Sequence, residues 1–316
     1  MFRIDESRFG EFTQVKVLDA VTGAYFTVIP EYGGNINELV LVKNEKEYSI
    51  IEGESNYSDL VNNMAKTYRS AKLIPFPNRI KDGHYRFNGN DYQLPINEKS
   101  MNNSLHGFFF DKKMDITHKE AHDNRASISL EYVYDGSVSG YPFLFKLRLV
   151  YILDSKEGFE CITEVTNVDQ VSLPVGDGWH PFFKTGGKVD ELMLQLPTDK
   201  KIMLDARMIP TGEVEKYDKF SAPQKIGNME FDNTFYVGDQ GGRVATFVRD
   251  TENDLTINIW QDTKSYRYLQ IYIPPERTSI AVEPMTCNVN SFNNNEGLII
   301  LEPGESFKAS YGVILQ

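Results

Sequence analysis

Hydrophobic and polar positions alternate along much of this chain, which is the pattern of strands that bury one face. The clearest stretches are residues 126–135, 143–154, 159–168, 254–262 and 268–275. Their β-branched and aromatic residues favour strands. Helical spacing is scarce, with residues 57–69 the best candidate, and no window alternates strands with helices as a parallel sheet requires. The pattern predicts an all-β fold, a large antiparallel β-sandwich with little helix.

Turn residues separate the predicted strands. Asp82-Gly83 and Asn88-Gly89 are dipeptides typical of tight hairpins. No low-complexity linker, heptad run or fixed-period repeat interrupts the strand pattern. We therefore expect one domain that spans residues 1–316.

Composition and charge narrow the classes of partner. The 316 residues are 41% hydrophobic and 12% aromatic, which is ample for a packed core. The net charge of -12 repels nucleic acid and anionic lipid. Residues 1–17 carry charges throughout, and no apolar run reaches the length of a membrane span. These features predict a cytoplasmic protein with neither nucleic acid nor membrane as partner.

The chain has two cysteines, Cys161 and Cys287, far apart in sequence and without the close spacing of a zinc site. A disulfide framework needs more cysteines than this. We expect both to be free, buried thiols.

Two of the five histidines have an unusual setting. His84 follows a turn glycine, and His118 and His122 lie in a charged stretch, so these three are expected at the surface. His106 in "LHGFFF" and His180 in "GWHPFF" stand beside glycine or proline and a run of aromatic residues. Such surroundings disfavour an imidazolium. Each is either a core histidine with satisfied nitrogens or an acid or base that faces a pocket.

Glu283 is the acidic residue with the most unusual setting, in the apolar segment "SIAVEPM". We expect it at a strand end, where Pro284 would stop the pairing. Apolar neighbours raise the pKa of a carboxyl group, which suits a general base, although a role in capping the next loop fits equally well. Arg79 and Asp232 are either ligand-binding or ordinary turn residues on local sequence alone.

Seven segments in order carry a resemblance to a known family. They are "LIPFPNRIKDGHYRFNGNDYQL", "NNSLHGFFF", "SGYPF", "LPVGDGWHPFF", "FDNTF", "AVEPMTCNVNSFN" and "GLIILEPGESF". In this order and spacing they resemble the aldose 1-epimerase (galactose mutarotase) family, from about Val15 to the C-terminus. The resemblance implies the galactose mutarotase-like supersandwich fold.

The resemblance also implies a reaction and its catalytic residues. Glu283 matches the general base, His180 the general acid, and His106 the histidine that contacts the ring oxygen of the sugar. Together they would open the ring of a free aldose such as galactose or glucose and close it again as the other anomer. No cofactor is implied, and the expected partner is a small monosaccharide.

The residues that bind the sugar are implied in the same way. Asn78, Arg79 and Asp232 match residues that bind sugar hydroxyls. Trp179 would shape the wall of the pocket together with Phe182 and Phe183, although packing in the core is the preferred role for the two phenylalanines. Many members have a second glycine after "LHG", where this chain has Phe108, so the preferred sugar stays open.

Rival functions remain open. Hexose-6-phosphate epimerases share the fold, and Lys66, Arg69 and Lys72 could bind a phosphate, but the "RGG" and "PQFG" segments typical of those enzymes are missing. A non-catalytic carbohydrate-binding protein would use the same sandwich. A glycosidase would need a second carboxylate beside Glu283, for which Asp232 is the candidate. A metal site built from the two buried-type histidines and Glu283 is disfavoured by their spacing.

Overall fold

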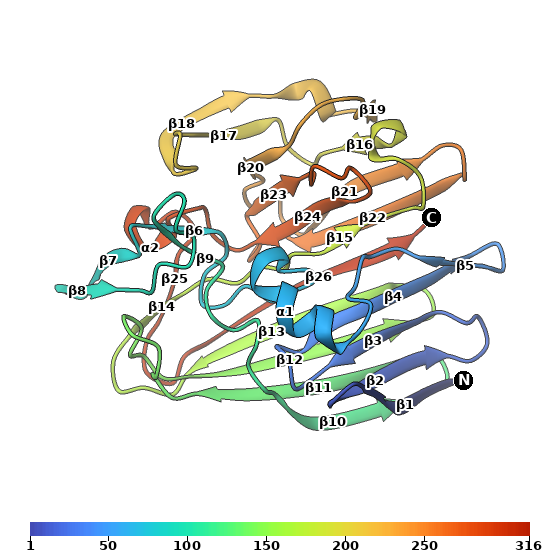
Figure 1. The fold of residues 1–316 in the computed structure, drawn as a ribbon, viewed down its shortest axis with the longest axis horizontal. Coiled ribbons are helices and arrows are strands. Elements are labelled where there is room, and N and C mark those ends of the chain that lie inside the picture. Colours follow the sequence, from blue (N-terminus) through green and yellow to red (C-terminus); the bar gives the residue numbers. More distant parts are fainter.

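The N-terminal strands form a five-stranded antiparallel sheet in the computed structural model, which describes residues 1–316 (Figure 1). Its strands follow chain order: β1 (Phe2–Phe9), β2 (Phe12–Asp19), β3 (Tyr25–Ile29), β4 (Asn35–Lys43) and β5 (Lys46–Ser49). Strand β2 alternates between fully buried and half-buried residues, and Val15 and Val17 are on its buried side. The sheet therefore has one face available for packing.

The largest sheet has nine strands, all antiparallel. In spatial order they are β10 (Asp115–Ala121), β11 (Arg125–Tyr134), β12 (Phe145–Asp154), β13 (Gly158–Asn167), β26 (Ser306–Leu315), β22 (Leu255–Asp262), β21 (Arg243–Asp250), β16 (Met193–Gln195) and β19 (Gln224–Lys225). Strands β11, β12, β13 and β22 confirm four of the five strands predicted from alternation.

The third large sheet has six strands and carries part of the site described below. Its order is β15 (Phe182–Phe183), β24 (Ile280–Met285), β23 (Tyr268–Tyr272), β20 (Asp232–Tyr236), β17 (Lys200–Leu204) and β18 (Pro210–Lys216). Three small ladders pair β14 (Leu173–Val175) with β25 (Ile299–Leu301), β6 (Arg79–Lys81) with β9 (Asn103–Leu105), and β7 (His84–Phe87) with β8 (Asn90–Gln93). Strand β23 confirms the fifth predicted strand.

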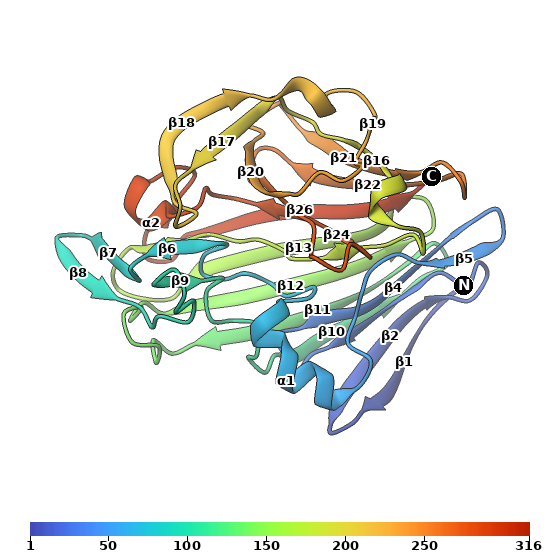
Figure 2. The same ribbon diagram turned by 45° about the horizontal axis from the view of Figure 1, so that its top comes forward.

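The sheets pack face to face, as Figures 1 and 2 show for the blue N-terminal strands and the green strands of the nine-stranded sheet. Between these two sheets, Phe26 meets Phe159 edge to face with ring centroids 5.4 Å apart. One cluster of 59 buried residues includes members of all three large sheets. The predicted antiparallel sandwich is confirmed, and the shared core supports our proposal of one domain.

Helix is confined to four short elements: α1 (Tyr57–Thr67), α2 (Ser291–Asn294) and the 3₁₀ turns η1 (Val189–Glu191) and η2 (Asp218–Phe220). The Asn56 side chain caps α1 by accepting a hydrogen bond from the Asp59 amide at 3.0 Å. Tyr68 ends the helix in the left-handed conformation, and its amide donates to the Met64 carbonyl at 2.8 Å. No helix is long and apolar enough to span a membrane.

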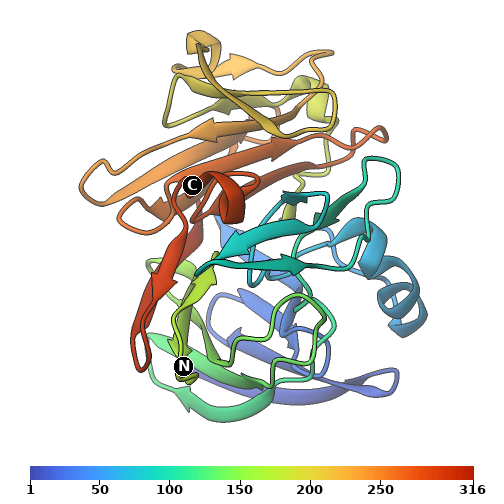
Figure 3. The same cartoon turned by 90° about the vertical axis from the view of Figure 1, so that its left-hand side faces the viewer.

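Only one of the two predicted hairpin dipeptides joins paired strands. Asn88-Gly89 connects β7 to β8, with Phe87 opposite Asn90. Asp82-Gly83 makes a turn, but the strands beside it pair elsewhere, β6 with β9 and β7 with β8. The hairpin prediction was wrong there because long-range pairing overrode the local turn. This cyan region lies at the left end of the molecule in Figure 1 and faces the viewer in Figure 3.

Candidate active site

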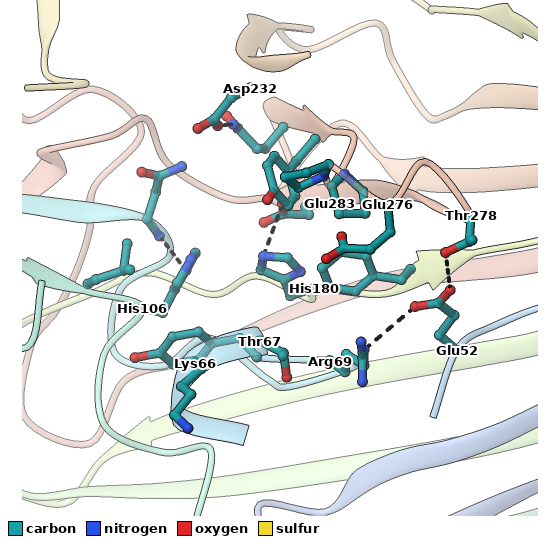
Figure 4. A pocket seen from close by; sticks show the side chains of 18 of the residues that line it. Glu52, Lys66, Thr67, Arg69, His106, His180, Asp232, Glu276, Thr278 and Glu283 are labelled. Carbon is teal, nitrogen blue, oxygen red and sulfur yellow. Dashed lines mark hydrogen bonds and ion pairs between the residues drawn. The ribbon is translucent and has the colours of Figure 1, made fainter. Parts of the chain in front are cut away.

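A cavity of about 520 Å³ opens where β15, β20, β23 and β24 approach the segment after α1 and the β6/β9 ladder. Six of the seven residues predicted for the site line it: Asn78, Arg79, His106, His180, Asp232 and Glu283. They come from distant parts of the chain, and Figure 4 shows four of them around one hollow. The seventh, Trp179, does not line the cavity.

His180 and Glu283 lie side by side in this cavity. His180 Nε2 is 3.4 Å from Glu283 Oε1 (Figure 4), longer than a well-formed hydrogen bond. Only 6% of His180 and 1% of Glu283 is exposed. His180 Nδ1 and Glu283 Oε2 are buried without a hydrogen-bond partner. Since buried polar atoms are rarely left unpaired, the two side chains are less completely satisfied than most buried polar groups.

Burial shifts both groups of this pair toward their neutral forms. It lowers the pKa of His180 to about 4. It raises the pKa of Glu283 well above its ordinary value, and the charge of Asp232 adds to that rise. The empty pair therefore holds a single proton over a wide pH range, as a neutral carboxylic acid beside a neutral imidazole.

His106 is held by Asn78 on the neighbouring segment. Both residues have positive φ angles, +61° and +57°. The His106 amide donates to the Asn78 carbonyl at 2.8 Å, and the Asn78 amide donates to His106 Nδ1 at 3.2 Å. Since Nδ1 accepts, the neutral ring carries its proton on Nε2. Burial and the neighbouring His180 hold the pKa of His106 well below its ordinary value, so it acts as a neutral donor.

The chain turns sharply just after His106. Gly107 has φ +66°, and a Cβ there would lie 2.2 Å from the Ile74 carbonyl oxygen. Only glycine fits this close approach. The His106 ring then packs between Tyr68 and His180, with centroid distances of 4.7 and 5.2 Å.

Arg79 is fixed by a carboxylate that sequence reasoning missed. Its Nε and Nη2 donate to Glu98 at 2.9–3.1 Å, and Nη1 donates to Asn78 Oδ1 at 3.2 Å. Such a bidentate arrangement sets the plane of the guanidinium. Nothing in the sequence around Glu98 distinguishes it from a surface residue.

Asp232 is held from the neighbouring strand by Gln270, which sequence reasoning also missed. Gln270 lies opposite Glu283 in the β23–β24 ladder, and its Nε2 donates to Asp232 Oδ1 at 2.6 Å. Burial raises the pKa of Asp232, against the pull of Arg79. The available signal was a lone amide in the otherwise apolar run "YLQIYI".

Trp179 is a core residue, which corrects the prediction that it shapes the wall of the sugar pocket. Its ring stacks on Tyr311 with centroids 4.8 Å apart, and its Nε1 donates to the Ser70 carbonyl at 3.1 Å. Phe183 is also in the core, whereas Phe182 lines the cavity and stacks on His180 at 4.9 Å. In this extended segment Trp179 and Phe183 face the core while His180 and Phe182 face the cavity, because successive side chains point to opposite sides.

Glu283 is not at a strand end, as its sequence suggested. Strand β24 continues to Met285, and Pro284 lies opposite Leu269 within the ladder. Pro284 has no amide to donate, but its carbonyl accepts from the Trp179 amide at 3.3 Å. The proline thus takes part in the sheet instead of ending it.

The basic residues considered for phosphate divide between the cavity and the core. Lys66 and Arg69 line the cavity, but Lys72 is fully buried and ion-paired with Asp177 at 2.7 Å. Arg69 is itself paired with Glu52 and Glu54 at 3.6 and 3.4 Å. A phosphate site made of all three cations does not exist in this fold.

The remaining predictions about single residues are confirmed. His84, His118 and His122 are exposed, and Cys161 and Cys287 are free and buried. The structure gathers no group of three His, Cys, Asp or Glu side chains suited to a metal ion.

A model of the aldose 1-epimerase family matches residues 21–313 of the chain. Among curated proteins, the chain is 31% identical over 247 residues to the uncharacterized protein YihR of Escherichia coli K12, covering 76% of this chain and 77% of YihR. It is 24% identical to the maltose epimerase of Levilactobacillus brevis, covering 73% and 72%. Identity to the galactose mutarotase of Homo sapiens is 25%, with 62% of each chain covered.

Solved structures show the same fold. A galactose mutarotase-like protein from Clostridium acetobutylicum superposes with a TM-score of 0.87 at 22% identity, covering 100% of this chain and 98% of the other. A galactose 1-epimerase from Lactobacillus acidophilus gives a TM-score of 0.82 at 17% identity, with the same coverage.

Proposed function

The chain belongs to the aldose 1-epimerase family, and we propose that it interconverts the α and β anomers of a free aldose such as galactose or glucose. The observation that carries this proposal is the pair of His180 and Glu283. An acid and a base lie 3.4 Å apart at a cavity, and each has a buried atom without a partner. A sugar bound in the cavity would place its C1 hydroxyl and ring oxygen against these two side chains.

Ring opening needs two proton transfers, which this pair can supply. Glu283 as carboxylate takes the proton of the C1 hydroxyl while His180 as imidazolium gives one to the ring oxygen. The bond from C1 to the ring oxygen breaks with its electron pair going to that oxygen, and C1=O forms. The open-chain aldehyde rotates about C1–C2, and closure on the other face reverses both transfers.

Substrate binding explains how a pair that is neutral when empty becomes charged for catalysis. The neutral and ionised forms contain the same single proton, so no proton enters or leaves. A C1 hydroxyl that donates to Glu283 and a ring oxygen that accepts from His180 both favour the ionised form. The sugar thereby replaces the water that the pair lost on burial.

The other site residues are proposed to hold the sugar in place. His106 donates from Nε2 to the ring oxygen, and Asn78, Arg79 and Asp232 bind hydroxyls of the ring. Glu98 and Gln270 hold Arg79 and Asp232 in place before the sugar binds. Binding therefore costs little side-chain entropy. One positioned acid or base contributes about 10² to 10⁴ in rate.

The charge of the cavity favours an unphosphorylated sugar over a hexose 6-phosphate. Its lining has three cationic side chains, Lys66, Arg69 and Arg79, and three acidic ones, Glu52, Asp232 and Glu276, besides Glu283, which burial keeps neutral in the empty site. Both arginines are already paired with glutamates. A doubly charged phosphate would meet little free positive charge here.

Polarimetry on freshly dissolved α-glucose and α-galactose tests the proposal. We expect the purified protein to accelerate the approach to the equilibrium rotation, with glucose 6-phosphate a poorer substrate and no release from an aryl glycoside. Sugar binding without acceleration would instead identify a carbohydrate-binding protein. Aryl release would identify a glycosidase that uses Glu283 and Asp232.

A further inference from the structure

Tyr68 occupies a backbone position that favours glycine. It ends α1 with a φ angle of +49°, in the left-handed conformation. Glycine is the usual residue in this conformation at a helix end, because any side chain there is costly. A tyrosine in this place indicates that its side chain has a role that glycine cannot fill.

The Tyr68 side chain faces the catalytic cavity and contacts His106. It lines the cavity, and only 5% of the residue is exposed. In Figure 4 its chain neighbours Thr67 and Arg69 lie below His106 and His180. The ring centroids of Tyr68 and His106 are 4.7 Å apart, and the ring planes are tilted by 54°. The Tyr68 ring is therefore part of the surroundings that set the orientation of the His106 ring.

His106 needs such support for both its backbone and its ring. Its φ angle of +61° is left-handed, a conformation that persists in a residue other than glycine only where the surroundings fix it. Its ring turns about the Cβ–Cγ bond, a torsion with broad energy minima. The hydrogen bond from the Asn78 amide to Nδ1 is 3.2 Å long, at the upper end of the normal range. Contact with Tyr68 limits the turn and so fixes the direction in which the Nε2 hydrogen points.

Asn97 holds both Tyr68 and the residue before His106. Its Nδ2 donates to the Tyr68 hydroxyl at 3.0 Å and to the Leu105 carbonyl at 2.9 Å. Its Oδ1 accepts from the Leu105 amide at 2.7 Å. One side chain thereby fixes the ring that contacts His106 and the backbone that leads into His106.

Space beside Tyr68 gives the bond to Asn97 its importance. Tyr68 also lines a second cavity of about 330 Å³, together with Asn97, Phe108 and Phe110. Phe108, at the position where many members of the family have glycine, lines this second cavity and not the catalytic one. Phe110 packs edge to face on Tyr68, with centroids 5.3 Å apart. A ring that borders open space can turn into it, and the hydrogen bond from Asn97 opposes that motion.

We propose that Tyr68 and Asn97 are positioning residues that hold His106 in place for the sugar. This inference rests on the proposed anomerase function and adds two residues that support its site. Tyr68 sets the His106 ring by direct contact, and Asn97 keeps Tyr68 and Leu105 fixed relative to each other. Neither residue transfers a proton, so both act through His106.

Double-mutant cycles with His106→Ala test the proposal on the aldose that the wild-type protein anomerises fastest. Tyr68→Leu should lower kcat/KM by about tenfold or more, and Asn97→Ala by about threefold to tenfold, because each loosens His106. In the His106→Ala background, either change should lower kcat/KM by less than about twofold further, because the group that it holds is gone. Losses that multiply in the double variants would overturn the positioning role alone. A wild-type protein that accelerates no sugar would overturn the anomerase function as well.

Two further variants separate the contact with His106 from the stability of the helix. Tyr68→Phe keeps the ring but loses the hydroxyl, so kcat/KM should fall by only about twofold to threefold. A loss as large as that of Tyr68→Leu would contradict the role of the ring contact. Tyr57→Leu, at the other end of α1 and outside the cavity, is the matched control and should keep the wild-type kcat/KM. A loss there equal to that of Tyr68→Leu would assign the effect to the helix and overturn the proposal.

The crystal structure of Asn97→Ala gives a result that does not depend on activity. Asn97 is exposed, so its truncation leaves the core intact. We expect the Tyr68 ring to turn toward the second cavity and the His106 ring to change its orientation or to occupy more than one. Tyr68 and His106 rings in their wild-type orientations would overturn the role of Asn97.

Discussion

Two pairs of acidic and basic side chains lie on opposite faces of three neighbouring segments, 70–73, 176–180 and β24, which are bridged at Lys72–Trp179 and Gly178–Met285. Lys72 and Asp177 face the core and are 2.7 Å apart, whereas His180 and Glu283 face the cavity and are 3.4 Å apart. The segments are joined by backbone hydrogen bonds, such as the Ser70 amide to the His180 carbonyl at 2.8 Å.

The two pairs differ in how completely their partners satisfy them. Lys72 also donates to Thr163 Oγ1 at 2.9 Å. Asp177 Oδ2 accepts from Lys72 and from the Tyr266 hydroxyl, and Asp177 Oδ1, which accepts no hydrogen bond, lies 2.7 Å from the Lys72 ammonium nitrogen. His180 and Glu283 each keep one buried atom unpaired. A satisfied buried pair fixes structure, while an unsatisfied pair on a cavity keeps binding capacity for a ligand. The comparison predicts that changes to the first pair cost stability and changes to the second cost activity.

The largest expected effect is on catalysis, in Glu283→Gln and His180→Asn. Each should lower kcat about 10² to 10⁴-fold, because each removes one proton-transfer group. The melting temperature should fall by less than about 3 °C, since neither side chain is well satisfied in the empty protein. Polarimetry and thermal unfolding measure the two effects. Near wild-type kcat in either variant would remove that residue from the mechanism.

The reverse result is expected for Lys72→Met. It leaves the buried Asp177 carboxylate uncompensated, which should cost about 3–5 kcal/mol of unfolding free energy. Denaturant titration measures the loss. The double variant Lys72→Met/Asp177→Leu is the matched control and should recover much of it, because no isolated charge stays buried. A Lys72→Met protein of wild-type stability would contradict a structural role for this pair.

The pH dependence of kcat/KM should report the burial of the catalytic pair. Below about pH 4, His180 takes up a second proton and the pair can no longer yield a base. At high pH, Glu283 loses the last proton of the pair, above the ordinary range of a glutamate because burial raises its pKa. The profile should be a bell with a broad plateau, losing about tenfold per pH unit beyond each limb. An acidic limb near the ordinary pKa of histidine would mean that His180 is not desolvated.

A smaller effect, on binding, is expected for Arg79→Ala. The loss of hydrogen bonds to sugar hydroxyls should raise KM about tenfold, with a weaker effect on kcat. Glu98→Gln is the informative companion, because it keeps Arg79 but weakens the contact that orients it. Its KM should lie between those of the wild type and Arg79→Ala. An unchanged KM in Arg79→Ala would contradict a role in binding.

Much of the fold could be predicted because alternation is a local signal. Strand β13 buries every second residue over its ten positions and β12 does so over its first seven, so their type and approximate bounds are visible in the sequence. Strand β11 buries residues 126–130 in a row, and its type is visible from its β-branched and aromatic residues. The pairing of β6 with β9 was not predictable, because it depends on contacts between residues far apart in sequence. The same holds for Pro284, whose role depends on the Trp179 amide.

The site was predictable only where a residue type is unusual in its surroundings. His106, His180 and Glu283 stand out in apolar segments and line the cavity. Glu98 and Gln270 act by holding Arg79 and Asp232, and such partners have no local pattern. Trp179 shows the opposite failure: its place beside His180 in the sequence suggested the pocket, although adjacent residues of an extended segment face opposite sides.

The smallest expected effect on activity is for Trp179→Phe. This variant tests whether the core face of residues 176–180 is separate from the face that lines the cavity. The variant removes the Nε1 donor to the Ser70 carbonyl and part of the stack on Tyr311, so it should lose about 1–3 kcal/mol of stability. The KM for glucose should stay within about twofold of wild type, because the indole lies on the core face with Lys72 and Asp177. Calorimetry and polarimetry measure the two quantities. A KM raised about tenfold at unchanged stability would show that Trp179 contributes to sugar binding. The distinction between a structural face and a catalytic face of this segment would then be wrong.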